Sequence, residues 1–126
     1  MRVFHVEDSP AVVESLNRML EAIPGVSVAG HASDAPHAIA GILRTRPDVV
    51  VTDVLLEGCT TGLEVLQAVR EREPRIDFYF LSNVVGPYRE VALKLGAQGY
   101  FDKYLEFERL RDVVADRALQ LHKQGS

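Results

Sequence analysis

Short apolar runs alternate with longer segments of helical periodicity along the chain, and this alternation constrains the fold more than any other feature. Short segments typical of strands occupy residues 3–6, 49–54 and 78–81, which are mostly apolar, residues 26–30, where apolar and small residues alternate, and residues 98–102. Segments with apolar residues at helical spacing follow them, at residues 10–23, 34–43, 63–69, 87–96 and 107–121. Such an alternation predicts an α/β protein whose parallel sheet carries helices on both faces.

The resulting (βα)5 count allows few topologies, because crossovers are right-handed and connections are short. The commonest five-stranded doubly wound order is the flavodoxin-like order 2-1-3-4-5, in which ligands bind beyond the carboxyl ends of the strands. Local signals agree with the helices. Ser9 can cap the first helix and Pro10 suits its first turn, Asp34 opens the second helix, and Gly96 suits the end of the fourth.

Composition narrows the class of protein. The chain has 126 residues, of which 47% are hydrophobic and 25% charged, so we expect a single domain over residues 1–126. The formal net charge of −4 argues against direct binding of nucleic acid, which needs clustered Lys and Arg. No apolar run approaches the roughly 20 residues of a membrane span, and the start lacks a signal peptide. These features predict a cytoplasmic protein without a membrane partner.

Charged and polar side chains follow the predicted strands at their carboxyl ends. Glu7 and Asp8 follow the first strand, Asp53 lies at the end of the third, Ser82 follows the fourth, and Lys103 follows the fifth. Neighbouring strands lie about 4.8 Å apart, so the three carboxylates should converge. Carboxylates that close repel one another unless a cation or a proton intervenes. Oxygen ligands of this kind suit Mg²⁺, the cofactor that we expect here.

The same residues meet the needs of phosphoryl transfer to a carboxylate. The charge on the transferred group must be stabilised by a metal, a lysine and hydrogen-bond donors, which the predicted ion, Lys103 and Ser82 would supply. Aspartate is a known nucleophile for making an acyl phosphate. Asp53 is the best candidate, because it lies centrally among these groups in the predicted topology.

At this point the chain resembles the receiver family of two-component response regulators. The matching motifs are Val6-Glu7-Asp8-Ser9, Val51-Thr52-Asp53-Val54, Leu81-Ser82-Asn83 and Gly96-Ala97-Gln98-Gly99-Tyr100-Phe101-Asp102-Lys103. They stand in the expected order, one at each expected strand end, and together they span nearly the whole chain.

The resemblance implies a role for each matching position. Asp53 would accept a phosphoryl group from a histidine kinase or a phosphotransfer protein. Mg²⁺ would be held by Asp8, Asp53, the backbone carbonyl of Leu55 and Glu7, the last directly or through water. Ser82 and Lys103 would bind the phosphoryl oxygens after transfer, and Tyr100 would move inward with Ser82 as a switch.

The resemblance also implies an output. Phosphorylation would reshape the surface formed by the fourth helix, the fifth strand and the fifth helix. That surface would bind an unknown downstream protein or form a homodimer, and the chain would not be an enzyme acting on a separate substrate.

Three positions depart from the family's pattern. Tyr104 stands where receivers usually have a proline with a cis peptide bond, so this loop must be strained or take another route. Asn83 replaces a small residue, and the loop 57–61 lacks a proline. The segment from Lys103 to Phe107 is similar to that of short, free-standing receivers, which predicts action without an attached output domain.

Two other functions remain open from the residues. One is a receiver-like scaffold that signals without phosphate. The other is a phosphohydrolase of the haloacid-dehalogenase type, although such enzymes need a second acid two residues after the nucleophile, where this chain has Leu55. Several residues have simpler interpretations: Tyr100 as a core aromatic, His5 as a core or sheet-face residue, and His31, His37, His122 and Cys59 as surface residues without a role.

Overall fold

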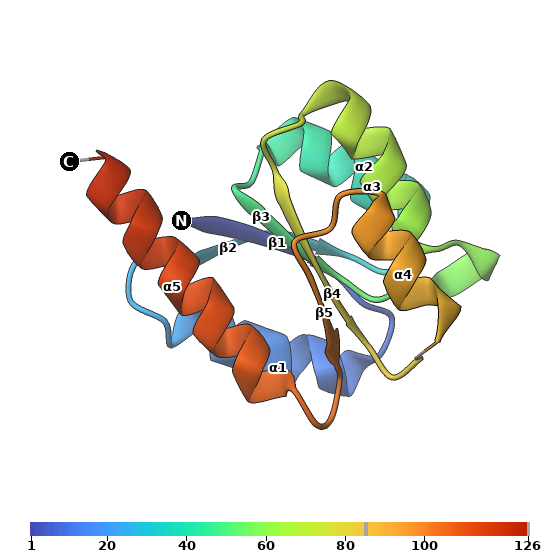
Figure 1. Cartoon of the computed structure of the whole chain (residues 1–126), viewed down its shortest axis with the longest axis horizontal. Helices are drawn as coiled ribbons and strands as arrows, with labels where there is room; N and C mark the ends of the chain where they lie inside the picture. The colour runs from blue at the N-terminus through green and yellow to red at the C-terminus, as the bar shows by residue number, and fades with distance from the viewer. Residues whose placement is uncertain (85, 126) are drawn as a thin grey trace.

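A parallel sheet lies at the centre of the computed structural model, which describes residues 1–84 and 86–125 (Figure 1). The strands within those residues are β1 (Arg2–Val6), β2 (Ser27–Ala32), β3 (Val49–Thr52), β4 (Asp77–Ser82) and β5 (Gly99–Asp102). The helices are α1 (Pro10–Glu21), α2 (Ala35–Thr45), η1 (Glu57–Cys59, a 3-10 turn), α3 (Gly62–Arg72), α4 (Pro87–Lys94) and α5 (Phe107–Gly125). The strand order is β2-β1-β3-β4-β5 with every neighbouring pair parallel, so the predicted flavodoxin-like fold is confirmed.

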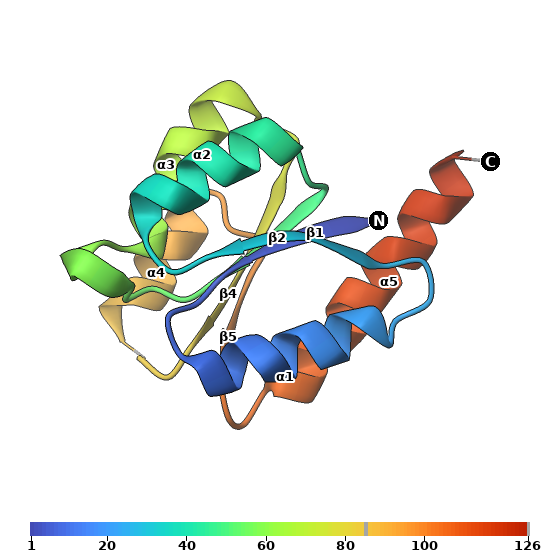
Figure 2. The same cartoon turned by 180° about the vertical axis from the view of Figure 1, so that it is seen from behind.

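Helices cover both faces of the sheet, α2, α3 and α4 on one and α1 and α5 on the other (Figures 1 and 2). Each face has its own apolar core. Phe4, Phe78 and Phe80 are buried toward α2, α3 and α4, whereas Leu16, Leu20 and Leu110 are buried toward α1 and α5. β3 is buried along its whole length, as expected for a central strand covered on both faces.

The edge strand β2 differs most from its prediction, since it runs to Ala32 rather than ending at Gly30. Its pairing with β1 has an irregularity, because Val3 pairs with Val28 but the next residue, Phe4, pairs with Gly30. A Cβ on Gly30 would lie 2.8 Å from the Phe4 ring. The glycine at this position therefore accommodates the ring, and the strand continues beyond it.

The chain turns sharply after β3, which ends at Thr52 rather than at Val54. Asp53 still donates its backbone N–H to the carbonyl of Val6. The next amide, that of Val54, instead donates to the Asp53 side chain. The ladder therefore ends after the Asp53 amide, because the next amide bonds to the aspartate side chain instead of to a neighbouring strand.

The helix ends lie where the predicted signals placed them, although one cap lacks its side-chain hydrogen bond. The Asp34 side chain accepts a hydrogen bond from the amide of His37 at the start of α2, and Gly96 has the left-handed φ of 102° expected just after α4. Ser9 is the N-cap residue of α1, as predicted, but its side chain makes no capping hydrogen bond. Pro10 at the first position leaves one amide fewer to cap.

Among residues 1–84 and 86–125, no helix has both the length and the apolar character needed to span a membrane.

Candidate functional site

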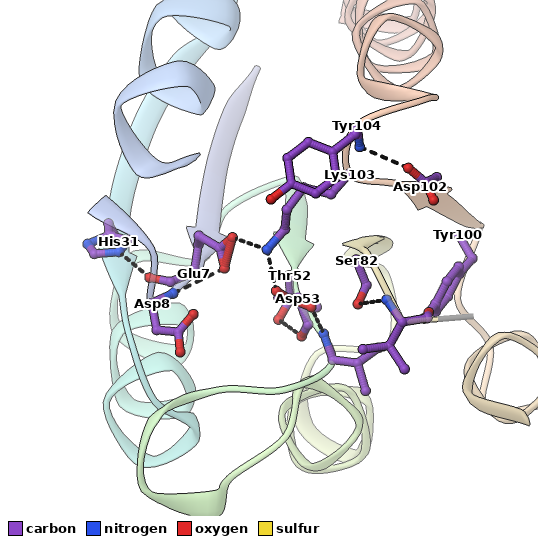
Figure 3. Close-up of polar contacts among 12 residues, drawn as sticks. Glu7, Asp8, His31, Thr52, Asp53, Ser82, Tyr100, Asp102, Lys103 and Tyr104 are labelled. Atoms are coloured by element: carbon purple, nitrogen blue, oxygen red, sulfur yellow. Dashed lines mark hydrogen bonds and ion pairs between the residues drawn. The ribbon is translucent and has the colours of Figure 1, made fainter. Parts of the chain in front are cut away.

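An acidic cluster lies where β1 and β3 end. One carboxylate oxygen each from Glu7, Asp8 and Asp53 lies within 4.8 Å of the others. The two acids that follow β1 differ in exposure, since the Glu7 residue is only 2% exposed whereas Asp8 is open to solvent. The predicted convergence of these side chains is confirmed (Figure 3). The cluster offers oxygen ligands with an open side, which is the form of site that holds a divalent metal ion.

Lys103 reaches this cluster from the end of β5. Its Nζ lies 2.6 Å from Oδ2 of Asp53 and 2.5 Å from Oε1 of Glu7. Burial alone would lower the pKa of Lys103, but the hydrogen bonds and charges of Asp53 and Glu7 outweigh it and raise the pKa above its ordinary value. The lysine is therefore a fixed positive charge beside Asp53.

Glu7 is held in an unfavourable setting for a carboxylate. Burial raises its pKa to about 7, and the charge of Asp53 adds to the rise, although Lys103 acts in the opposite direction. One ammonium group faces three carboxylates here. The site therefore has room for further positive charge, which a metal ion would supply.

The backbone around Asp53 is packed closely. Oδ1 of Asp53 accepts a hydrogen bond of 2.6 Å from the amide of Val54, and the Thr52 hydroxyl donates to the Asp53 carbonyl at 2.9 Å. A Cβ on Gly62, the first residue of α3, would lie 2.1 Å from that carbonyl oxygen. Only glycine fits at this position, so α3 begins directly against the Asp53 backbone.

Leu55, whose backbone carbonyl is an expected metal ligand, lies two residues beyond Asp53 and bridges to Thr61. The hydrogen bonds of that bridge use the carbonyl of Val54 and the amide of Leu56. The bridge therefore leaves the Leu55 carbonyl available, while its side chain is 48% exposed.

Ser82 and Tyr100 lie on the other side of Asp53 from Glu7 and Asp8 (Figure 3). The buried Ser82 hydroxyl accepts a hydrogen bond of 3.2 Å from the amide of Val84. The Tyr100 hydroxyl donates to the Val84 carbonyl, and its ring stacks on Phe80 with centroids 5.9 Å apart. Both side chains thus contact the first turn of the β4–α4 loop at one residue, Val84. Burial raises the pKa of Tyr100, so its hydroxyl keeps its proton and remains a donor.

The loop after Lys103 takes another route than a cis peptide, because the described residues contain none. Oδ1 of Asp102 accepts the amides of Tyr104 at 2.9 Å and Leu105 at 2.8 Å. This is the local turn that aspartate favours. An aspartate directly after a predicted strand, with no proline in the next three residues, could have indicated this turn. Asp102 was not among the predicted site residues.

The histidines near β1 are better connected than expected. His31 is exposed, as predicted, but its Nε2 lies 2.9 Å from the carbonyl oxygen of Glu7. His5 is fully buried, as predicted for a core residue, with Nε2 2.7 Å from the Asn17 side chain. Burial lowers the pKa of His5, which keeps the ring neutral. His31 reaches the site because β2 pairs with β1. The sequence spacing within one segment does not indicate this contact.

The chain is similar to known proteins in sequence and in structure. A family model described as the response regulator receiver domain matches residues 3–115. The DNA-binding transcriptional activator DevR/DosR of Mycobacterium tuberculosis is 32% identical over 124 residues, which cover 94% of this chain and 57% of that protein. The nitrate/nitrite response regulator protein NarL of Escherichia coli is 31% identical over 118 residues, which cover 90% of this chain and 52% of that protein. This chain thus spans about half the length of these curated relatives.

Solved structures agree with the sequence matches. The signal receiver domain of the putative response regulator NarL from Mycobacterium tuberculosis superimposes with a TM-score of 0.83 at 30% identity, over 93% of this chain and 94% of that one. A two-component response regulator of the LuxR family from Aurantimonas sp. SI85-9A1 gives a TM-score of 0.86 at 28% identity, over 94% and 85%.

Proposed function

The chain belongs to the response regulator receiver family, and from that membership we propose that Asp53 is its phosphoacceptor, supplied by a histidine kinase or a phosphotransfer protein. Receivers are generally phosphoacceptors and not enzymes with a separate substrate. We further propose that residues 1–126 act as one receiver domain, whose phosphorylation and dephosphorylation are self-catalysed.

One observation carries the assignment of Asp53. Its carboxylate lies within 4.8 Å of two other acids and forms an ion pair with the ammonium group of Lys103, which also contacts Glu7. Oδ1 is oriented by the amide of Val54, and Oδ2 faces Lys103. A carboxylate that is buried, oriented and beside a fixed cation has the features of a nucleophile for a highly charged group.

The transfer needs little covalent chemistry from the protein. An Asp53 oxygen forms a bond to phosphorus as the P–N bond of a phosphohistidine donor breaks, and the departing imidazole takes up a proton. Lys103 would compensate the added negative charge, and the Ser82 hydroxyl would donate to a phosphoryl oxygen. Positioning and charge therefore supply the catalysis.

Magnesium is the ion that we propose for the acidic cluster. Its ligands would be Asp8, Asp53 and the backbone carbonyl of Leu55, with Glu7 contributing directly or through water. The donor set fits, because it consists of oxygen atoms only and because the bridge to Thr61 leaves the Leu55 carbonyl unused. When bound, the ion neutralises charge that develops on the phosphoryl oxygens.

The proposed output is a change at α4, β5 and α5. Ser82 and Tyr100 both contact Val84 in the loop that leads to α4. A Ser82 hydroxyl drawn toward a phosphoryl group would release the Val84 amide, and Tyr100 would follow the displaced loop. Phosphate at Asp53 would in this way alter the surface that a downstream protein recognises.

The same surface is a candidate for homodimer formation. Val91, Tyr104 and Leu105 are exposed apolar residues on α4 and on the β5–α5 loop. We propose that phosphorylation pairs two copies through this surface. Light scattering in the presence of a phosphoryl mimic should give the dimer mass, and a monomer mass with and without the mimic would exclude the dimer.

The alternative functions have weaker support. A haloacid-dehalogenase-type hydrolase needs a proton-donating acid at position 55, and the side chain there is an exposed leucine. A phosphate-independent scaffold would not need the buried contact between Lys103 and Asp53.

Intact mass after incubation with acetyl phosphate tests the proposal. Wild type should gain one phosphoryl group only when Mg²⁺ is present, and Asp53→Asn should gain none. Lys103→Ala should still take up some phosphoryl group but lose the change in amide exchange over α4, β5 and α5. A normal gain of mass in Asp53→Asn would overturn the assignment.

A further inference from the structure

The β5–α5 loop contains a hydrogen-bonded lock around Lys103. Oδ1 of Asp102, the residue before the lysine, accepts the amides of Tyr104 and Leu105. Glu106 closes the other side: its Oε1 accepts the amide of Asp102 at 3.0 Å, and its own amide donates to the Asp102 carbonyl at 3.0 Å. The chain is thus fixed immediately before and immediately after Lys103.

The lock continues into the sheet. Asp102 is the last residue of β5 and pairs with Ser82 on β4. The amide of Lys103 donates to the Ser82 carbonyl at 3.0 Å. The backbone of Lys103 is therefore held by β4 on one side and by the Asp102 turn on the other, and its side chain leaves this point toward Glu7 and Asp53 (Figure 3).

Lys103 is buried, but packing leaves space on one side of it. A cavity of about 200 Å³ lies beside it, lined by Val12, Ser15, Lys103, Tyr104 and Phe107. Tyr104 and Leu105, the next two residues, are 73% and 86% exposed and contribute little cover. Lysine has a flexible four-carbon stem, so without a fixed backbone its ammonium group has space to leave Asp53.

From these contacts we infer that Asp102 is a positioning residue for the phosphorylation reaction, one that acts through Lys103 by fixing the turn from which the lysine reaches Asp53. The inference rests on the proposed function of Asp53 and Lys103. Asp102 fixes the turn through its acceptor oxygen and not through its charge, because both turn contacts are hydrogen bonds from backbone amides to Oδ1.

The consequence for stability differs from the consequence for the reaction. The amides of Tyr104 and Leu105 belong to exposed residues, so water can replace the lost acceptor in Asp102→Ala. The reaction is more sensitive, since a misplacement of about 1 Å can cost up to about a hundredfold in rate. We expect phosphorylation of Asp102→Ala by acetyl phosphate to be slower by about tenfold.

A double-mutant cycle tests the inference. The rate of phosphoryl gain is measured by intact mass, at saturating Mg²⁺, for wild type, Asp102→Ala, Lys103→Ala and the double variant. If Asp102 acts through Lys103, its removal slows the wild-type background but leaves the Lys103→Ala background unchanged. The same factor in both backgrounds would overturn the inference, since a merely structural role is independent of the lysine.

Rescue by a conservative variant provides the second arm, and it does not depend on residual activity in Lys103→Ala. Asp102→Asn keeps the acceptor oxygen and loses the charge, so its rate should return close to that of wild type. A rate as low as that of Asp102→Ala would contradict the inference. If Asp102→Ala does not fold, Glu106→Ala breaks the lock from its other side and should show the same dependence on Lys103.

Failure of the proposed function has a different signature. A wild-type protein that gains no phosphoryl group removes the premise, whereas a phosphorylated wild type with a normal Asp102→Ala rate removes only the role of Asp102.

Discussion

At the scale of single residues, Asp8 differs from its two neighbours in the acidic cluster because its side chain is open to solvent. An exposed carboxylate can meet an incoming ion before the buried ones do. It is also the member of the cluster without an ion pair to Lys103 among the described contacts. Its negative charge is thus free to serve a metal.

We therefore predict that Asp8→Asn weakens Mg²⁺ binding by at least about tenfold, since even the loss of a residue that only supports a metal ligand typically costs about tenfold to a hundredfold in affinity. Titration followed by calorimetry or NMR measures the affinity. Glu71→Gln is the matched control, since Glu71 is an exposed acid on α3 outside the acidic cluster. Unchanged affinity in Asp8→Asn would transfer the main metal contact to Glu7.

Tyr79 on β4 provides a prediction on pH. Burial, with the charge of Asp77 adding to it, raises its pKa above the ordinary value. Above a pH of about 10 the unfolded chain therefore loses this proton while the folded protein keeps it. The free energy of unfolding should fall as the pH rises past that point, and it should fall less steeply in Tyr79→Phe.

Urea unfolding at a pH of about 9 and about 10.5 measures this difference on both sides of the ordinary tyrosine pKa. Tyr104→Phe removes an exposed hydroxyl and serves as the control, with the slope of wild type. Equal slopes in Tyr79→Phe and wild type would show that the ionisation of Tyr79 is not linked to folding.

At the scale of elements, Arg70 ties the end of α3 to two loops. Its guanidinium donates to the carbonyls of Pro74 and Ile76 before β4 and of Gly96 after α4, each at 2.8 to 2.9 Å. It also lies over the Phe78 ring, 5.7 Å from the centroid. The C-terminal end of α4 is thereby held against α3, so that movement of α4 is expected at its other end, next to Val84.

We predict that Arg70→Ala lowers the free energy of unfolding by about 1–3 kcal/mol, because three carbonyls lose a charged donor. Urea denaturation measures the loss. Arg70→Lys should restore little of it, since an ammonium group lacks the planar geometry that serves several acceptors at once. Arg72→Ala, an exposed arginine in the same helix, should stay close to wild type.

The elements themselves were largely predictable, and the exceptions have local causes. Apolar runs indicated β3 and β4 because both strands are buried on both faces. β2 was predicted to end at Gly30, two residues too early. The length of an edge strand depends on its pairing with the neighbouring strand, and only the structure reveals the Phe4 ring against Gly30.

The site was predictable where it depends on strand ends alone, which indicated Glu7, Asp8, Asp53 and Lys103. The contacts of Asp102 and His31 depend on turn geometry and strand register.

At the scale of the whole molecule, the strand order explains why the site lies where it does. β1 and β3 are neighbours at the sheet's centre, so the acids that follow them meet, and β4 and β5 deliver Ser82 and Lys103 to the same edge. Helices on both faces bury the strands but leave this edge open at Asp8. The fold thus gathers around Asp53 two acids from the end of β1, a hydroxyl from the end of β4 and an ammonium group from the end of β5.

Localisation of the phosphoryl group tests the central claim most directly. Borohydride reduces an aspartyl phosphate to homoserine, with release of phosphate, whereas it leaves a free carboxylate unchanged. Protein treated with acetyl phosphate and Mg²⁺, then with borohydride, is digested and sequenced by mass spectrometry. Homoserine at position 53 alone is the predicted result. Homoserine at position 8 in place of position 53, or a phosphorylated protein with intact Asp53, would contradict the assignment of Asp53 as the phosphoacceptor.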